Sequence, residues 1–332
     1  MRIAATRPGA LLRTPFHSVR TVRGAMAPPP AALNDAAADA VPGAPGDAAA
    51  VAALLQRRAL GLVSSFMTED GAKVDYVACA KSDEFADYVA ATALLRGVEA
   101  EALGTVPQRR AFFLNLYNCL TVHGLLDAAS TAGSLPSSVQ KLPDFWNRTS
   151  YRVGRRELNL NDIEHGILRG NALQPAARAP HWRADDERAA LALPLDPRIH
   201  FALNCGAKSC PPIRVFTADN LEYGLTAAAA SFLEGETKVE GRVVTLSRLL
   251  LWYGRDFGST QREVLQTVAR LLREGSATRA VLEGLLADTR DAPVGFAASA
   301  FNAAQKVALP NFCPRGAVDV RFSPYDWSLN TT

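Results

Sequence analysis

The sequence predicts an α+β fold in which many helices surround a small, mostly antiparallel sheet. Two segments, 151–158 and 238–246, alternate polar and apolar residues about a glycine and therefore predict β-hairpins. Longer segments carry apolar residues at helical spacing, most clearly over 109–126. Because hairpins and helices do not alternate as a regular βαβ repeat, a doubly wound parallel sheet is not expected.

The composition is that of an ordinary globular protein. The 332 residues are 48% hydrophobic and 21% charged, which allows a sizeable core and argues against overall disorder. With 36 basic and 33 acidic residues the net charge is +3, so nucleic acid is not expected as a partner. No uncharged run reaches the roughly 18 residues that a transmembrane segment needs. The sequence identifies no cofactor and no other partner.

Residues 1–50 differ in composition from the rest and are predicted to be a disordered region before a single globular domain, 51–332. The first acidic residue is Asp35, and it is preceded by Arg2, Arg7, Arg13, Arg20 and Arg23. An arginine-rich, acid-poor N-terminus is typical of a mitochondrial or plastid transit peptide. A disordered tail on a cytoplasmic protein explains the same residues, and both interpretations stay open.

Within the domain, helices are predicted over 51–66 and 84–95, followed by the central helix 109–126. The central helix is apolar nearly all round, as expected of a buried helix, but it contains Asn115, Asn118, Cys119 and His123. Buried amides and imidazoles need hydrogen-bond partners. The two asparagines and the histidine therefore either form a structural network with neighbouring loops or line a pocket and bind a ligand.

A short helix is predicted over 161–169, with Asn161 as its N-cap and Gly170 as its C-terminal cap. Glu164 falls at the third helical position, where it can reach back to the Asn161 backbone amide. Glu164 also lies in the middle of the apolar arc, and a partly desolvated carboxylate suits acid/base chemistry. Both roles stay open for Glu164. His165, at the edge of the arc, is either a ligand or a surface residue.

A long charged connection, 171–195, contains His181 and Trp182. It is either a cover over a neighbouring site or an insertion without a role. Toward the C-terminus, the pattern predicts a helix capped by Thr217, an edge strand over 318–322, and further helices over 249–253, 264–272 and 280–286.

Segment 196–214 carries the densest set of reactive side chains in the sequence. Its apolar run 199–205 predicts a strand that belongs to the sheet. Alternation along this strand puts Cys205 on the face of the bulky apolar residues, so Cys205 is interpreted as a core side chain. The same alternation puts His200 and Asn204 together on the opposite face, which makes both of them site candidates.

Cys210 follows in the turn after this strand, with Lys208 and Ser209 beside it as ligand-binding candidates. Positive charge near a thiol lowers its pKa, which favours Cys210 as the reactive cysteine. The chain has an odd and sparse set of cysteines: Cys79, Cys119, Cys205, Cys210 and Cys313. Such a set is not a disulfide framework and fits a mostly reduced compartment. One local bridge between Cys205 and Cys210 stays open.

Five blocks of sequence stand out, in order along the chain: FLNLYN (113–118, with His123 after it), DIEHGILR (162–169), DPRIHFALNCGAKSCPPI (196–213), LSRLLLWYGRDFG (246–258) and YDWSLN (325–330). Together they resemble the family named domain of unknown function 547, over about residues 74–330. Asn161 stands where the family pattern often has Ser or Thr, and Asn caps a helix equally well. The resemblance implies where a site would lie and implies no particular reaction.

Three functions are compatible with these residues, and the first is a thiol enzyme. Cys210 would be the nucleophile, His200 or His165 the base, and Asn204 or Asn118 the orienting amide. The reaction would be acyl transfer or amide hydrolysis. The candidate catalytic residues are therefore Cys210, His200, Glu164 and His165.

The other two functions do not need a catalytic thiol. A metal site would use His165, His200, Cys205, Cys210 and Glu164, although the spacing of the cysteines is wider than in a zinc knuckle. A non-catalytic module that binds a ligand or peptide, or a network that only holds the fold, would use Asn115, Asn118, Glu164, His165, His200 and Asn204. In each case we expect the central helix, the 161–169 helix and segment 199–210 to converge on one pocket.

Overall fold

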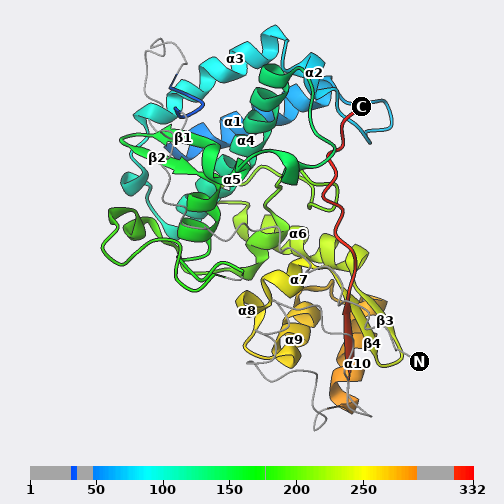
Figure 1. Ribbon diagram of the computed structural model, residues 1–332. Helices are drawn as coiled ribbons and strands as arrows, with labels where there is room; N and C mark the ends of the chain where they lie inside the picture. The colour runs from blue at the N-terminus through cyan, green and yellow to red at the C-terminus, as the bar shows by residue number, and fades with distance from the viewer. Residues whose placement is uncertain (1–30, 36–47, 176, 290–317) are drawn as a thin grey trace, which may run out of the picture.

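Helix α4 (Val106–Ala132) runs through the centre of the larger part of the molecule (Figure 1). The structure is a computed structural model and describes residues 31–35, 48–175, 177–289 and 318–332. The α+β prediction is confirmed, since helices dominate and the strands form two small sheets. The arginine-rich N-terminus and Cys313 lie outside the described residues. Among the described helices, none has the length and apolar character required to cross a bilayer.

The ends of α4 are fixed by its sequence. Thr105 and Gln108 form a reciprocal capping box at the start, Pro107 occupies the first turn, and Gly133 ends the helix with φ of 68°. The helix is therefore longer at both ends than the predicted 109–126. It is apolar nearly all round because neighbours cover it on several sides, among them α1 (Ala48–Ser65) and α2 (Tyr76–Cys79). The same large apolar core includes α3 (Asp83–Thr92) and α5 (Phe145–Arg148).

The first predicted hairpin is confirmed. Strand β1 (Ser150–Val153) pairs antiparallel with β2 (Arg156–Asn159) around Gly154, whose φ of 55° suits a glycine turn. Asn34 and Asp35 pack onto this hairpin through the backbone and guanidinium of Arg152. The described part of the predicted N-terminal tail therefore belongs to the folded domain. Single 3₁₀ turns fill the connections in this part of the chain: Ala93–Gly97, Ala100–Ala102, Val139–Lys141 and Glu187–Leu191.

The helices and strands that enclose a smaller apolar core lie in the lower part of Figure 1. Strand β3 (Lys238–Glu240) pairs antiparallel with β4 (Val243–Leu246), as the second predicted hairpin requires. Strand β5 (Asp319–Phe322) lies at the edge, as predicted, and runs parallel to β4. The helices of this part are α6 (Leu221–Glu236), α7 (Leu249–Trp252), α8 (Gly254–Phe257), α9 (Gln261–Leu271) and α10 (Ala277–Asp288).

The prediction of a strand over 199–205 is wrong. Pro197–Phe201 form a 3₁₀ helix, η6, and irregular chain follows. Asp196 caps this turn by accepting a hydrogen bond from the Arg198 N–H, and Pro197 fixes φ at its first position. A short apolar run does not by itself distinguish strand from helix. The alternation that assigned Cys205 to the core therefore has no structural basis.

Residues Asp162–Leu168 form a π-helix, η4, where an α-helix is predicted. Gly170 follows it with φ of 62°, in agreement with its predicted role as a terminator. Asn161 makes no side-chain capping bond, and Glu164 does not turn back toward it. The capping role for Glu164 is thus also wrong. Short π-helical turns are rare and occur frequently at functional sites, because the wider turn re-aims its side chains.

The connection 171–195 packs against this π-helix and is hydrogen-bonded to it. Asp162 Oδ1 accepts hydrogen bonds from the indole N–H of Trp182 at 2.9 Å and from Arg188 at 3.2 Å, and it lies 2.8 Å from His181 Nε2. The Trp182 ring fills the space over Gly166, where any β-carbon would lie about 2.4 Å from it. The connection therefore braces the π-helix.

The last ten residues run as an extended strap from β5 back to the larger part of the molecule (Figure 1). Ser323 is tied to β4, Asp326 and Ser328 to segment 208–209, and Asn330 to Val74, all through backbone hydrogen bonds. The strap thus crosses the two apolar cores and is held in place along its length. This course brings Tyr325 and Trp327 over the segment that contains the two central cysteines.

Candidate functional site

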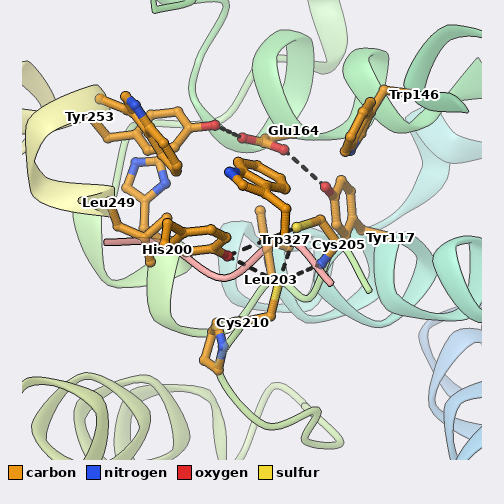
Figure 2. A pocket seen from close by; sticks show the side chains of 13 residues that line it. Tyr117, Trp146, Glu164, His200, Leu203, Cys205, Cys210, Leu249, Tyr253 and Trp327 are labelled. Carbon is orange, nitrogen blue, oxygen red and sulfur yellow. Dashed lines mark hydrogen bonds between the residues drawn. The ribbon is translucent and has the colours of Figure 1, made fainter. Parts of the chain in front are cut away.

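A pocket lies where the central helix, the π-helix, segment 200–211, the α7 region and the C-terminal strap meet (Figure 2). Its cavity volume is about 40 Å³, and the pocket opens in part to solvent. The polar groups that line it are a carboxylate, an imidazole, two thiols and three phenols, and the apolar lining is dominated by three indoles. The lining residues are Tyr117, Trp146, Glu164, His200, Leu203, Cys205, Cys210, Pro211, Leu249, Trp252, Tyr253, Tyr325 and Trp327.

The sulfur of Cys210 takes part in three hydrogen bonds at one end of the pocket. Its Sγ lies 3.0 Å from the Sγ of Cys205, 3.2 Å from the Cys205 backbone nitrogen and 3.2 Å from the Tyr325 hydroxyl. Both cysteines are free thiols. Each of the three neighbouring groups can donate a hydrogen bond to Cys210, so the arrangement favours a thiolate there.

The pKa values of the two thiols are shifted in opposite directions. Burial alone would raise the pKa of Cys210, but hydrogen bonds from the Cys205 thiol, the Tyr325 hydroxyl and the Cys205 N–H outweigh burial and lower the pKa. The pKa of Cys205 is raised well above its ordinary value, because Cys205 donates to Cys210 and is itself buried beside that charge. Burial, followed by the proximity of both sulfurs, also raises the pKa of Tyr325, which therefore remains a donor. Cys210 is thus the more acidic thiol of the pair.

Glu164 lies between two phenols in the same pocket (Figure 2). The hydroxyl of Tyr253 donates to Oε1 at 2.6 Å, and the hydroxyl of Tyr117 donates to Oε2 at 3.0 Å. Burial, and then the charge of Glu164, raise the pKa of both phenols, so they keep their protons. A carboxylate that accepts two fixed hydrogen bonds is held in one orientation.

His200 lines the pocket, and its ring is held by Asp256 and Tyr253. Its Nε2 lies 2.7 Å from Oδ2 of Asp256, and its ring stacks on Tyr253 with 4.0 Å between centroids. Asp256 also receives two hydrogen bonds from Arg169, at 2.7 and 2.9 Å. Burial would raise the pKa of Asp256, but the bonds from Arg169 and His200 hold it far below its usual range. This buried ion pair fixes His200, which in turn supports the ring of Tyr253.

Residues 104–233 match the model of a family described as protein of unknown function, DUF547. This segment is a DUF547 domain. Neither the curated proteins nor the solved structures contain a match to the chain. The DUF547 segment includes the first three sequence blocks, while the blocks at 246–258 and 325–330 lie beyond it. The pocket therefore combines DUF547 residues, such as Glu164 and Cys210, with later ones, such as Tyr253 and Tyr325.

The predicted convergence of three DUF547 segments is observed, but the central helix contributes Tyr117 to the pocket. The predicted polar residues of that helix bind other groups. Asn115 makes two hydrogen bonds to the backbone of Phe216, at 2.7 and 2.9 Å. His123 Nδ1 lies 2.8 Å from the Tyr151 hydroxyl, and burial lowers the pKa of His123 to about 3. These hydrogen bonds fit the structural network that is one of the two interpretations of these residues.

Asn118 and Asn204 shape the segment that carries the cysteines. Asn118 donates to the carbonyl of Ala202 at 3.0 Å and accepts from the Asn204 N–H at 2.9 Å. Asn204 donates to the carbonyl of Pro211 at 2.9 Å and accepts from the Gly206 N–H at 2.8 Å. The two asparagines thus hold both ends of the turn that contains Cys205 and Cys210.

The remaining predicted residues lie around the pocket. His165 is fully buried, and its Nδ1 accepts a hydrogen bond from Arg169 at 3.1 Å. Lys208 and Ser209 donate their backbone N–H groups to Ser328 and Asp326, and the Ser209 hydroxyl accepts from the Asp326 N–H. These contacts seat the C-terminal strap. In the described part of the chain, no group of three or more His, Cys, Asp or Glu side chains has metal-binding geometry.

Sequence reasoning missed the phenols and the buried carboxylate that organise the pocket: Tyr117, Tyr253, Tyr325 and Asp256. The sequence does not single out the phenols because Tyr is also a common core residue, and nothing local separates the two roles. A signal was nevertheless present in the sequence. Each of these four residues lies inside one of the five blocks that resemble DUF547, and a polar or phenolic residue inside such a block merits consideration.

Proposed function

We propose that this protein is a thiol-dependent acyl hydrolase or acyltransferase whose nucleophile is Cys210. The observation that carries the proposal is the convergence of three donors on the Cys210 sulfur inside a pocket that also contains Glu164. A thiolate is the nucleophilic form of cysteine, and these donors stabilise it without an adjacent histidine base. The pocket thus supplies a nucleophile and a separate proton acceptor.

The first half of the proposed reaction acylates Cys210. The thiolate adds to the carbonyl carbon of the substrate, a C–S bond forms, and the carbonyl electron pair moves onto oxygen. The hydroxyl of Tyr325, 3.2 Å from the attacking sulfur, is placed to donate to this oxyanion. Collapse expels the leaving group, which takes a proton from water at the pocket mouth, and a thioester remains on Cys210.

The second half releases the acyl group. Glu164 takes a proton from a water molecule, or from an acceptor alcohol or amine, as that molecule attacks the thioester. The C–S bond breaks and its electron pair returns to Cys210 as thiolate. The proton on Glu164 returns to solvent and replaces the one that the leaving group took. Tyr117 and Tyr253 orient Glu164 for this step, and His200 acts through Tyr253 as a positioning residue.

The pocket walls favour an apolar or aromatic acyl group. Trp146, Trp252 and Trp327 lie around the space in which the thiol is found, together with Leu203 and Leu249. Indole rings bind planar or aliphatic groups through their faces and edges and contribute a large contact area. The charged groups of the pocket lie at the thiol and at Glu164, which suits a substrate with one polar carbonyl and an apolar body.

Activated esters test the proposal directly. The full chain is mixed with p-nitrophenyl esters of acetic, hexanoic and phenylacetic acid, and the release of nitrophenol and the mass of the protein are followed. We expect a burst and an acyl adduct on Cys210 that is absent in Cys210→Ser. The matched control is Cys205→Ser, which keeps a donor beside Cys210 and should keep the burst. An unchanged burst in Cys210→Ser, or an adduct on another residue, would refute the nucleophile.

A second candidate function is binding of an apolar ligand without turnover. It is favoured by the hydrogen bond between His200 Nε2 and Asp256, because the partner of this nitrogen is a carboxylate and not the thiol. In that case the esters and their acids bind, and quench tryptophan fluorescence from the three indoles of the pocket, but wild type and Cys210→Ser release nitrophenol equally slowly. The same titration therefore separates the two functions.

A further inference from the structure

We infer that Cys205 and Cys210 form a reversible dithiol–disulfide couple and that this pair is an oxidative modification site of the pocket. Their sulfur atoms lie 3.0 Å apart in one short turn, so they need to approach by about 1 Å to bond. Both side chains line the pocket (Figure 2), and both residues are partly exposed rather than buried. The inference extends beyond acyl chemistry, and the modification itself does not depend on that activity.

The turn between the two cysteines is already closed in the reduced protein. Asn204 bonds the carbonyl of Pro211 at 2.9 Å, which ties together the residues that flank the pair. Inside the turn, Cys210 N–H donates to Ala207 at 3.0 Å, and Gly206 adopts φ of 88°, where a glycine is required. Forming the bond therefore closes no new loop of flexible chain, and little conformational entropy is lost.

The two thiols divide the chemistry between them. Cys210 is the stabilised thiolate and attacks first, whereas Cys205 retains its proton and resolves the product. The other two described cysteines provide a contrast: Cys79 and Cys119 are buried, and burial raises the pKa of each to about 12. Oxidation should therefore be confined to the Cys205–Cys210 pair among these four.

A hydroperoxide is the class of oxidant that fits a small pocket. The Cys210 thiolate attacks the terminal oxygen of ROOH, the O–O bond breaks, and RO⁻ takes a proton from water, which leaves Cys210 as a sulfenic acid. The sulfur of Cys205 then attacks the sulfur of Cys210, and the Cys205 proton leaves with the hydroxyl group as water. The two sulfurs together lose two electrons to the peroxide bond. A small dithiol reverses the change by two exchange steps and is itself oxidised to its disulfide.

Disulfide formation would remove the nucleophile of the proposed enzyme. Cys210 would no longer present a thiolate to a substrate, and Tyr325 would lose the charged acceptor of its hydrogen bond. This consequence rests on the proposed function. The existence of the couple is measured separately, by mass, in protein that need not have any activity.

Trypsin provides a direct readout because Lys208 lies between the two cysteines. Cleavage at Arg198, Lys208 and Arg214 yields peptides 199–208 and 209–214, which stay joined only when the disulfide is present. The full chain is treated with a small excess of hydrogen peroxide, quenched by alkylation and digested. We expect the linked pair, lighter by two hydrogens than the sum of its parts, and its loss after dithiothreitol. Cys79 and Cys119 in the same digest should remain reduced.

Two variants separate the roles of the thiols. Cys205→Ser should accumulate a sulfenic acid on Cys210, which dimedone captures, and Cys210→Ser should give neither product. The inference is overturned if wild type yields sulfinic acid on Cys210 without the linked pair, or if urea-unfolded protein forms the pair as fast as the native protein. Loss of the ester burst on oxidation, with recovery after dithiothreitol, tests the consequence for catalysis without bearing on the couple itself.

Discussion

Replacement of Tyr325 by Phe removes one hydroxyl and leaves the ring that packs against Trp252 and Trp327. The lost bond runs from the Tyr325 hydroxyl to the sulfur of Cys210, at 3.2 Å. A hydrogen bond to a charged group contributes roughly 1.5–3 kcal/mol. One pKa unit corresponds to about 1.36 kcal/mol, so the pKa of Cys210 should rise by about one to two units. Because the pocket opens partly to solvent, we expect the lower end of this range.

The pH dependence of alkylation measures this change in the pKa. Iodoacetamide reacts with the thiolate, so the rate of labelling of peptide 209–214 follows the ionisation of Cys210. In Tyr325→Phe the midpoint should move to higher pH, and labelling at a pH below the wild-type midpoint should slow by about tenfold if the pKa rises by one unit. Tyr253→Phe is the matched control, because its hydroxyl bonds Glu164 in the same pocket. An unchanged midpoint in Tyr325→Phe would show that the strap does not stabilise the thiolate.

Three further predictions concern the carboxylates. Asp256→Asn leaves the buried guanidinium of Arg169 without its ion pair and should lower the free energy of unfolding by about 3–5 kcal/mol in urea titrations. The control is Asp186→Asn, which breaks a more exposed ion pair with Arg188 and should lower the free energy of unfolding by at most about 1 kcal/mol. Folding lowers the pKa of Asp256, so the ionised carboxylate stabilises the folded protein at any pH above the ordinary pKa of 3.8. This stabilisation is lost as the pH falls toward the pKa of Asp256 in the folded protein. Between pH 5 and 2 the wild type should therefore lose more stability than Asp256→Asn. Glu164→Gln should retain the nitrophenol burst while steady-state turnover falls by roughly 10²-fold or more; equal losses in both phases would contradict a role in deacylation.

Local patterns in the sequence predicted the elements whose causes are local. The glycine turn of the first hairpin, the apolar surface of α4 and the alternation of β5 each depend on neighbouring residues alone. The run 199–205 failed because two features outside its own periodicity decide its conformation, namely the Asp196 cap and Pro197. The wrong strand prediction also affected the predicted site, because it assigned Cys205 to the core. The sulfur of Cys205 in fact lies 3.0 Å from the sulfur of Cys210.

The role of a polar residue was harder to predict than its position. Asn118 and Glu164 both lie on buried helical surfaces, and nothing local distinguishes them. Asn118 bonds the backbone of segment 202–204, which an amide does well because it both donates and accepts. Glu164 as a carboxylate only accepts, and it bonds two phenols from different parts of the chain. Its environment depends on Tyr253, which is 89 residues away.

The pocket is completed by chain segments that the DUF547 match does not include, and this has a consequence for its chemistry. The match ends at residue 233 and includes Cys210 and the backbone N–H that bonds it, while Tyr325 arrives on the strap. The strap is held by backbone bonds to segment 208–209, directly beside the thiol, so movement of either segment changes the distance between hydroxyl and sulfur. The hydrogen bond by which Tyr325 helps to lower the pKa of Cys210 is therefore made from the docked strap. For the proposed enzyme, this hydrogen bond would link the nucleophile to a segment that the DUF547 match does not include.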